Sequence, residues 1–333
     1  MPGTISTGNE GTTERYEPIA QLDTVVFSKL LDRDPGQVKK LISSCEKDGF
    51  FYLDISDQYS AKMLETFAEL SSTMKEWFAQ PTEVKLKEFA ISMASHGYKP
   101  IGSQAGTHGG RDGWEVLKTG RFELEGRWGL PKVVEDNYES FARFQSQCHY
   151  ITHVLLDRIS NALGMRGAQS LNNFHRNNSP SKSALAFLHY VPMDPTGANV
   201  GHNVHTDYGT LTLVFAPQWG LQVFSPENKG NPGLEWEFVE PRPGCAIVNV
   251  ADVLRFLTND RLKSAVHRVL PLPDVDRYST TYFLRPSDDL DFTDGDGNMT
   301  NVLDWYDRKN NMYEAPSKVQ DRSLLVGGLY KEL

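Results

Sequence analysis

The sequence predicts a mainly β protein, a sandwich or barrel, with helices flanking it. From residue 183 onward, short runs rich in β-branched and aromatic residues alternate with turn clusters at 228–233 and 241–244. Many short strands with such regular punctuation are typical of a sandwich or barrel. Before residue 183, apolar residues instead recur every three or four positions, which indicates amphipathic helices. The runs expected as strands are 184–191, 211–215, 221–224, 236–239, 246–250, 266–270 and 278–284.

The first half of the chain is expected to supply helices and one strand. The pair Asp34-Pro35 provides an N-cap and a first-turn proline for a helix. A long amphipathic helix is expected between 141 and 163. On it His149 and His153 share a face, where we expect surface histidines and weigh a metal pair as the alternative. The other expected elements are a strand at 50–53, a helix at 63–78, a glycine-rich loop at 95–113 and a helix after 300 on the outside of the molecule.

Composition limits the classes of partner. The net charge of −9 argues against a nucleic-acid surface, because phosphate binding needs clustered lysine and arginine. No apolar run approaches the roughly 20 residues that a membrane span requires. The three cysteines form no Cys-x-x-Cys pair, which fits a reducing compartment. We therefore expect a cytoplasmic protein with no nucleic-acid or membrane partner, and take it to be a monomer.

A His-x-Asp pair and a later histidine are the candidate metal ligands. His205 and Asp207 are two residues apart, so on a strand both side chains would face the same way. His267 lies in another expected strand and would complete two imidazoles and one carboxylate, the facial set of non-haem Fe(II) oxygenases. A single His-x-Asp is weak evidence, since nine histidines make chance pairs common. The alternative makes His205 a polar strand residue and His267 a hydrogen-bonded core histidine.

Arg277 and Ser279 strengthen the metal interpretation. They are again two residues apart on an expected strand, ten residues after His267. A guanidinium binds a carboxylate through two parallel hydrogen bonds, and a hydroxyl can add a third. An exposed arginine beside a solvated serine is the alternative. The joined pattern of His-x-Asp, His and Arg-x-Ser on successive strands is much more specific than any of its parts.

With these residues in view, the chain resembles the 2-oxoglutarate- and Fe(II)-dependent oxygenases of the isopenicillin N synthase-like type. The resemblance covers nearly the whole chain. It is carried by EKDGFFY at 46–52, GHNVHTDYGTLT at 201–212, PGCAIVNVAD at 243–252, TNDR at 258–261, SAVHRV at 264–269 and RYSTTYFLRP at 277–286.

The resemblance implies a distorted double-stranded β-helix, a jelly-roll core with flanking helices. It also implies Fe(II) on His205, Asp207 and His267, 2-oxoglutarate held by Arg277 and Ser279, and O2 as the oxidant. The expected segments are a disordered tail at 1–18, a leading helical and strand region at 19–125, a long helix and connection at 126–182, the catalytic core at 183–290 and a C-terminal helical segment at 291–333.

The sequence departs from the family beside this site. Where many members have Asn-Tyr-Tyr-Pro, this chain has His189-Tyr190-Val191-Pro192. The family's Asn and second Tyr help to position the co-substrate, so we include His189 among the expected co-substrate residues. Strand alternation would aim Tyr190 away from the metal. Phe283 resembles a pocket-lining aromatic, and ordinary core packing is its equal alternative.

The function expected from the resemblance is oxidation of a small molecule, a secondary-metabolite intermediate, with succinate and CO2 as co-products. Hydroxylation, desaturation and ring rearrangement all remain open. One alternative is an iron oxidase or oxidative cyclase of the same fold that uses no 2-oxoglutarate, since such enzymes also carry Arg-x-Ser. A zinc hydrolase would need a general base that is not evident beside the motif. A catalytically inactive binding protein is the third alternative.

Overall fold

The computed structural model describes residues 18–57, 60–88, 95–104, 111–192, 201–228, 235–315, 317–320, 323 and 325. The expected disordered tail lies almost wholly outside these residues. The described helices are α1 (Phe27–Leu31), α2 (Pro35–Lys47), α3 (Ala61–Phe78), α4 (Thr82–Glu88), α5 (Arg121–Gly126), α6 (Lys132–Asp136), α7 (Tyr138–Ala162), α8 (Asp252–Leu257), α9 (Val302–Glu314) and α10 (Ser317–Gln320).

Two sheets form the centre of the described structure. The large sheet has the order β1-β2-β10-β7-β12-β5-β4-β3 and the small sheet the order β6-β11-β8-β9. The large sheet comprises β1 (Thr24–Val26), β2 (Phe50–Asp54), β3 (Gly97–Lys99), β4 (Trp114–Gly120), β5 (Ala184–Tyr190), β7 (Leu211–Phe215), β10 (Cys245–Val250) and β12 (Arg277–Leu284). The small sheet comprises β6 (His202–His205), β8 (Leu221–Phe224), β9 (Trp236–Phe238) and β11 (His267–Val269), and β13 (Asp291–Thr293) pairs with β14 (Met299–Asn301) outside both sheets.

The seven strands expected after residue 183 all form, with boundaries close to those predicted. The helix after Pro35 also forms as expected, because the Asp34 carboxylate accepts a hydrogen bond of 2.8 Å from the Gln37 backbone N–H. The mainly β class with flanking helices is therefore confirmed.

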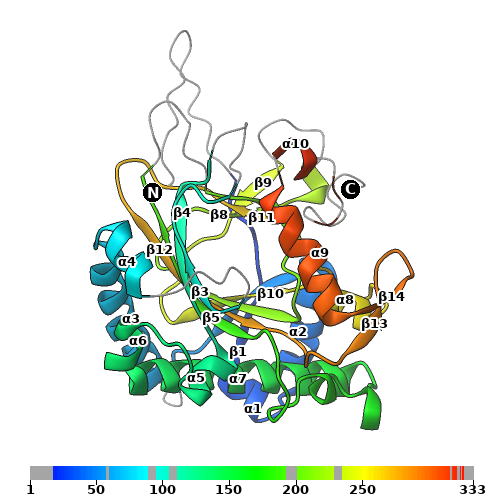
Figure 1. Ribbon diagram of the computed structural model, residues 1–333. Helices are drawn as coiled ribbons and strands as arrows, with labels where there is room; N and C mark the ends of the chain where they lie inside the picture. Colours follow the sequence, from blue (N-terminus) through cyan, green and yellow to red (C-terminus); the bar gives the residue numbers. More distant parts are fainter. Residues whose placement is uncertain are drawn as a thin grey trace.

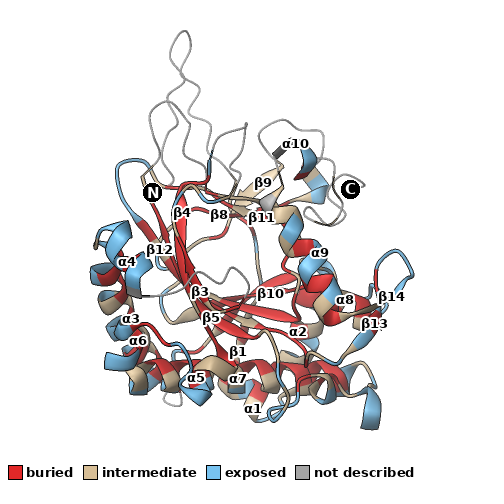
Figure 2. Cartoon of the chain, viewed as in Figure 1, coloured by how far each residue is buried: buried red, intermediate tan, exposed pale blue. Residues whose placement is uncertain are grey.

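Helices cover the outer face of the large sheet. The long helix α7 runs beneath this sheet, and α3 lies along one side of it (Figure 1). Phe144 of α7 stacks on Phe67 of α3, and both rings contact Phe215 of β7. Buried residues concentrate on the strands and on the helix faces turned toward them (Figure 2). These apolar contacts hold α3 and α7 against one face of the large sheet.

The opposite face of the large sheet packs against the small sheet. Alternate residues of β5 divide between the two layers: Leu185 and Phe187 join the helix side, while Leu188 and Tyr190 join a cluster that also contains Val223 of β8. A strand sends successive side chains to opposite faces, so this division is what the pleat requires. The space between the sheets is where polar side chains gather.

Two local expectations are wrong. The glycine-rich segment expected as a loop contains β3, which pairs antiparallel with β4. The expected helix after residue 300 forms as α9, and its inner face is buried at Trp305 and Lys309. The first small-sheet strand ends at His205, so Asp207 lies in the turn that follows instead of on the strand.

Within the described part of the chain, no helix is long and apolar enough to cross a membrane.

Candidate metal centre

His205, Asp207 and His267 converge in the space between the sheets. His205 ends β6 and is the register partner of His267 at the start of β11. The Nε2 atoms of His205 and His267 lie 3.7 Å and 4.0 Å from Oδ1 of Asp207. The three candidate ligand atoms all lie within 4.8 Å of one another. Among the described residues, this is the one group of three such side chains close enough to share an ion.

Hydrogen bonds orient these side chains toward a common point. Nδ1 of His205 lies 2.6 Å from the Asn203 carbonyl oxygen, and Nδ1 of His267 lies 3.1 Å from that of Ala265. A carbonyl oxygen accepts only from a protonated Nδ1, which leaves each Nε2 with a free lone pair. The imidazoles therefore present the nitrogen that a metal needs.

The carboxylate is held in the same way. Oδ2 of Asp207 accepts hydrogen bonds of 2.7 Å from Thr212 and 2.9 Å from Asn249, which leaves Oδ1 for a metal. Burial acts to raise the pKa of Asp207, but His267, His205 and these hydrogen bonds outweigh it and lower the pKa to about 2. Burial lowers the pKa of His205 to about 3. Neutral imidazole and ionised carboxylate are the protonation states that bind a divalent metal.

The turn that carries Asp207 is fixed by buried contacts. The Asp207 carbonyl oxygen accepts a 2.8 Å hydrogen bond from the Asp252 backbone N–H. The Asp252 carboxylate in turn accepts from Thr206 and pairs with the fully buried Lys309 of α9. Ser264 donates to the other oxygen of Asp252 at 2.7 Å. The Asp252 carboxylate thus links Thr206, which follows His205, to Ser264, which lies three residues before His267.

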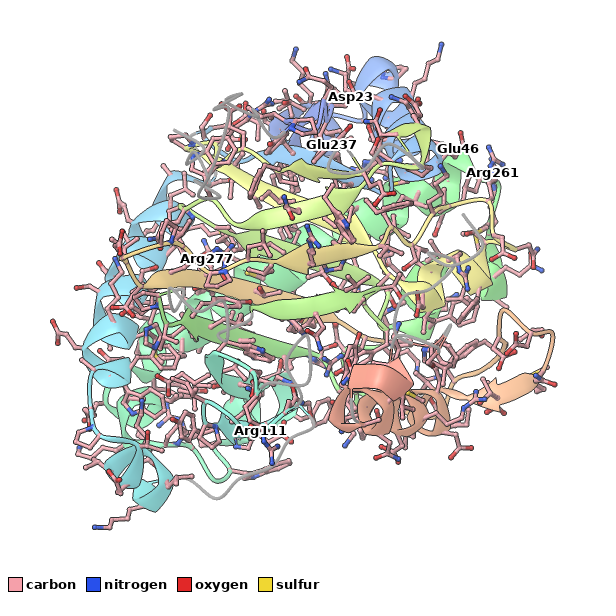
Figure 3. The ribbon with its side chains drawn as sticks, turned by 90° about the horizontal axis from the view of Figure 1, so that it is seen from above. Asp23, Glu46, Arg111, Glu237, Arg261 and Arg277 are labelled. Carbon is pink, nitrogen blue, oxygen red and sulfur yellow. The ribbon has the colours of Figure 1, made fainter. Side chains whose placement is uncertain are left out.

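Arg277 and Ser279 lie together on β12 and line the same cavity as the triad. Arg277, the first residue of β12, is labelled in Figure 3. Its Nε donates to the Trp219 carbonyl oxygen at 2.7 Å, and Nη1 donates to the Ser279 hydroxyl at 3.3 Å. Only 1% of Arg277 is exposed, and no carboxylate among the described residues pairs with it. A buried guanidinium without an acid partner is suited to a ligand carboxylate.

Two aromatic residues considered in the sequence analysis, Tyr190 of β5 and Phe283 of β12, line this cavity. Tyr190 faces the cavity, with its ring 4.9 Å from the Arg277 guanidinium, so the expectation that it points away is wrong. Burial raises the pKa of Tyr190 to about 12. Phe283 lines the cavity, as the first of its two interpretations proposed.

The structure does not bring His189 together with the other site residues. Its two ring nitrogens lie 2.8 Å from Glu115 and 2.8 Å from Asp276, and its ring stacks on Tyr278. These contacts are on the helix side of the large sheet, because His189 alternates with the cavity-facing Leu188 and Tyr190. Both nitrogens are engaged there, which leaves none for a co-substrate.

The sequence did not reveal a second group of cavity residues. Lys118 of β4 and Arg285, just after β12, line a part of the cavity that also contains Asn310 and Tyr313 of α9. Lys118 lies in a strand that the sequence did not predict. Arg285 closes the quoted RYSTTYFLRP segment, but nothing local distinguished it from an exposed arginine.

The histidine pair on α7 lies outside this cavity. Nδ1 of His149 lies 2.8 Å from the Tyr282 hydroxyl, and Nε2 lies 2.7 Å from Oδ1 of Asn177. Both nitrogens of His149 are therefore in use, and the metal-pair alternative gains no support.

Comparison with known proteins agrees with this arrangement. Residues 182–286 match the family model described as the 2OG-Fe(II) oxygenase superfamily. Residues 18–132 match the model for the N-terminal region of non-haem dioxygenases in morphine synthesis. A 2-oxoglutarate-dependent dioxygenase of Gibberella zeae is 49% identical over 94% of this chain and 94% of its own length. This chain belongs to the 2-oxoglutarate/Fe(II)-dependent oxygenases.

Other members of the family support the assignment. A 2-oxoglutarate-dependent dioxygenase of Glarea lozoyensis is 38% identical over 93% of this oxygenase and 93% of the relative. The structure of Neurospora crassa T7H in complex with alpha-KG is similar with a TM-score of 0.69 and 25% identity, covering 86% of this chain and 95% of that one. JOX2 in complex with 2OG, Fe and JA gives a TM-score of 0.70 at 19% identity, covering 92% and 90%. These neighbours have the double-stranded β-helix fold, so the fold prediction is confirmed.

The residues present fit the metal and co-substrate of the family. Two imidazoles and one carboxylate on one side of a site are the donor set of non-haem Fe(II) oxygenases. The buried Arg277, without an acid among the described residues, fits the far carboxylate of 2-oxoglutarate.

Proposed function

We propose that this protein is an Fe(II)/2-oxoglutarate-dependent oxygenase that oxidises a small molecule, with His205, Asp207 and His267 as its iron ligands. In this proposal Arg277 and Ser279 bind the distal carboxylate of 2-oxoglutarate. When bound, iron and 2-oxoglutarate supply the activation of O2, with release of succinate and CO2.

The protein's own contribution is positioning and exclusion of water. Asn249 and Thr212 keep Oδ2 of Asp207 occupied, so that a single carboxylate oxygen faces the metal. The Trp219 carbonyl oxygen holds Nε of Arg277, which points the remaining guanidinium nitrogens into the cavity. Phe50 packs edge-on against His267, with ring centroids 5.3 Å apart, and limits the rotation of that ligand. Such fixed geometry lowers the entropic cost of bringing co-substrate and substrate together.

The observation that carries the proposal is the common cavity. The triad, Arg277 and Ser279 line one space, although they come from two sheets and a turn. A zinc hydrolase would need a general base to activate a metal-bound water, and Asp207 is the one carboxylate among the described lining residues. His202 is the one lining histidine outside the triad, and burial holds its pKa well below the usual value, which makes it a weak base.

A single reconstitution tests the proposal. The purified protein is loaded anaerobically with Fe(II) and 2-oxoglutarate, exposed to O2 with candidate substrates, and assayed for succinate. We expect succinate release that depends on iron and rises with a true substrate. Oxygen consumption with substrate but without any requirement for 2-oxoglutarate would instead favour the iron oxidase of the same fold. The Asp207→Ala variant serves as the metal-free control.

We further propose a secondary-metabolite intermediate as the substrate, and a cytoplasmic monomer as the working form. Three free cysteines, Cys45, Cys148 and Cys245, support a reducing compartment.

A further inference from the structure

Three consecutive residues between β7 and β8 lie against Arg277 and its chain neighbours. They are Gln218, Trp219 and Gly220, which we call the arginine cradle. The Trp219 carbonyl oxygen accepts a 2.7 Å hydrogen bond from Nε of Arg277. Under the proposed function, on which this inference rests, Arg277 binds the distal carboxylate of 2-oxoglutarate. The other two residues of the cradle have contacts that fix this arginine.

The Gln218 side chain binds the backbone on both sides of Arg277. Its Nε2 donates to the Asp276 carbonyl oxygen at 2.9 Å, and its Oε1 accepts from the Tyr278 backbone N–H at 2.8 Å. A primary amide offers the same donor and acceptor as a peptide group, and the backbone pairing of β12 with β7 stops short of this point. The amide therefore takes the place of a neighbouring strand. On the other edge of β12, Arg277 pairs with Tyr190 of β5.

Gly220 leaves room for the Arg277 side chain. Its φ is +120°, a backbone conformation that residues with a Cβ rarely adopt. A Cβ at this position would lie 2.8 Å from Nε of Arg277 and 2.5 Å from the Leu270 carbonyl oxygen. Both distances are shorter than van der Waals contact, so a larger residue would displace the guanidinium. The observed position of Arg277 therefore requires glycine at 220.

The arginine cradle is itself held by the small sheet. The Gly220 carbonyl oxygen accepts a 2.8 Å hydrogen bond from the backbone N–H of Leu270, just after β11. The Trp219 ring packs edge-on against Phe238 of β9, with ring centroids 6.1 Å apart. Arg277 belongs to the large sheet, so the cradle fixes it relative to the small sheet as well. A ligand-binding group needs such support, because a displacement of about 1 Å is enough to weaken its contacts.

We propose that Gln218 and Gly220 are positioning residues for the co-substrate, which act through Arg277. Gln218 fixes the backbone segment that carries this arginine, and Gly220 keeps the path of its side chain open. Neither residue is among those that line the triad cavity. The affinity for the distal carboxylate of 2-oxoglutarate therefore depends on two residues outside the cavity.

Calorimetric titration with a matched pair of 2-oxoacids tests this. Protein loaded anaerobically with Fe(II) is titrated with 2-oxoglutarate and with 2-oxopentanoate, which has the same carbon chain length but no distal carboxylate. Gln218→Met keeps the approximate length of the side chain and removes both hydrogen bonds. We expect this variant to bind 2-oxoglutarate about tenfold more weakly, which is the scale of one or two hydrogen bonds. Its affinity for 2-oxopentanoate should equal that of the wild-type protein.

Combination with Arg277→Gln separates positioning from a general structural role. Because Gln218 acts through Arg277, Gln218→Met should cause little further loss of 2-oxoglutarate affinity in the Arg277→Gln background. Gly220→Ala should show the same pattern as Gln218→Met. Gly297→Ala is its control, because φ of Gly297 is +81° and no atom lies within 4 Å of the added Cβ. Gln21→Met, at an exposed glutamine, should leave both affinities unchanged.

The possible results distinguish this inference from the proposed function. Wild-type affinity for 2-oxoglutarate in Gln218→Met, an equal loss for both 2-oxoacids, or the same tenfold loss in the Arg277→Gln background overturns the positioning inference. Gln218→Met decides the matter if Gly220→Ala fails to fold. A wild-type protein that binds the two 2-oxoacids equally well contradicts the proposed role of Arg277, and with it the proposed function.

Discussion

A buried guanidinium needs a compensating charge, and Arg277 has none among the described residues. Its fixed contacts are with the Trp219 carbonyl oxygen and the Ser279 hydroxyl, both uncharged. Burial lowers the pKa of Arg277, but arginine stays protonated at any physiological pH. The strongest interaction open to it is therefore with an anionic ligand.

Replacing this charge should weaken co-substrate binding specifically. We expect Arg277→Gln to raise the KM for 2-oxoglutarate by about 100-fold, since a lost buried charge pair costs roughly 2–5 kcal/mol. Steady-state succinate assays at varied 2-oxoglutarate measure the change. Arg176→Gln, at a partly exposed arginine that pairs with Asp289, is the control. An unchanged KM in Arg277→Gln would remove this residue from the co-substrate site.

Iron affinity should depend on the residues behind Asp207 as well as on Asp207. Asn249 donates to Oδ2 of Asp207 at 2.9 Å, so Asn249→Ala frees that carboxylate to rotate. We expect about a 10- to 100-fold loss of iron affinity, the usual cost of removing such a supporting hydrogen bond. Iron titration measures it, with Asp207→Ala giving no specific binding and the exposed Asn161→Ala giving wild-type binding. Full iron affinity in Asp207→Ala contradicts the ligand assignment.

At the scale of elements, α9 supports the site from outside the sheets. Lys309 pairs with Asp252 and donates to Thr206, and the Tyr313 hydroxyl donates to the Thr206 carbonyl oxygen at 2.9 Å. Thr206 lies between two of the ligands. Helix α9 therefore stabilises the turn that carries Asp207 in addition to covering apolar surface.

Loss of the buried lysine should destabilise the fold. Lys309→Met leaves the Asp252 carboxylate buried without its cation, so we expect the free energy of unfolding to fall by about 3–5 kcal/mol. Urea denaturation measures this. Lys132→Met breaks an ion pair on the surface of α6 and should cost less than about 1 kcal/mol. Equal costs for the two variants would show that the buried pair has no special role.

At the scale of the whole molecule, the large sheet separates an apolar layer from a polar cavity. Phe144 and the other rings of the helix layer contact one face, whereas Arg277 and Ser279 occupy the other. The helix layer is not wholly apolar, because His175 is buried at its edge. Its Nδ1 lies 2.7 Å from the Leu171 carbonyl oxygen and its Nε2 lies 2.7 Å from the Thr210 hydroxyl.

Because His175 is buried, we expect the free energy of unfolding to fall in mild acid. Burial lowers the pKa of His175 from its usual 6.5 to about 3, and that of His153 to about 4, so the folded protein keeps both neutral. The unfolded chain takes up protons below 6.5. These two histidines therefore leave the free energy of unfolding unchanged above that pH and lower it as the pH falls toward the folded pKa values, by about 1.4 kcal/mol per pH unit for each histidine.

Urea denaturation between pH 7 and pH 5 tests this prediction. His175→Gln should be less stable than the wild-type protein at pH 7, but its stability should decline by about 1.4 kcal/mol less per pH unit. His149 lies close to both groups, and burial also lowers its pKa, so some dependence will remain. The same slope in both proteins would contradict the assignment of a neutral buried His175.

The predictions from sequence succeeded where a strand has a clear local signature. The runs 211–215 and 221–224 match β7 and β8 residue for residue, because β-branched and aromatic residues are bounded there by turns. They failed for β4, whose Glu115 and Lys118 do not indicate a buried strand. Only the fold shows that Lys85 and Tyr98 satisfy the Glu115 carboxylate.

Which side chains of β5 face the cavity could likewise not be predicted from the sequence. All seven of its residues are buried, so no alternation of apolar and polar residues reveals which ones face the cavity. The sequence prediction included His189 from its place in the family motif, although Tyr190 is the residue that lines the site. A shift of one residue exchanges the two faces of a strand.

The sequence by itself determined the family, the sheet-rich core and the residues most suited to hold iron and 2-oxoglutarate. These depend on local chemistry, since two residues on a strand or turn already define a ligand pair or a carboxylate clamp. Only the tertiary structure decided that Lys118 and Arg285 line the cavity beside Asp207. They lie far apart in the sequence, and strand pairing through β5 brings their segments together. The lining of the cavity therefore depends on long-range strand pairing.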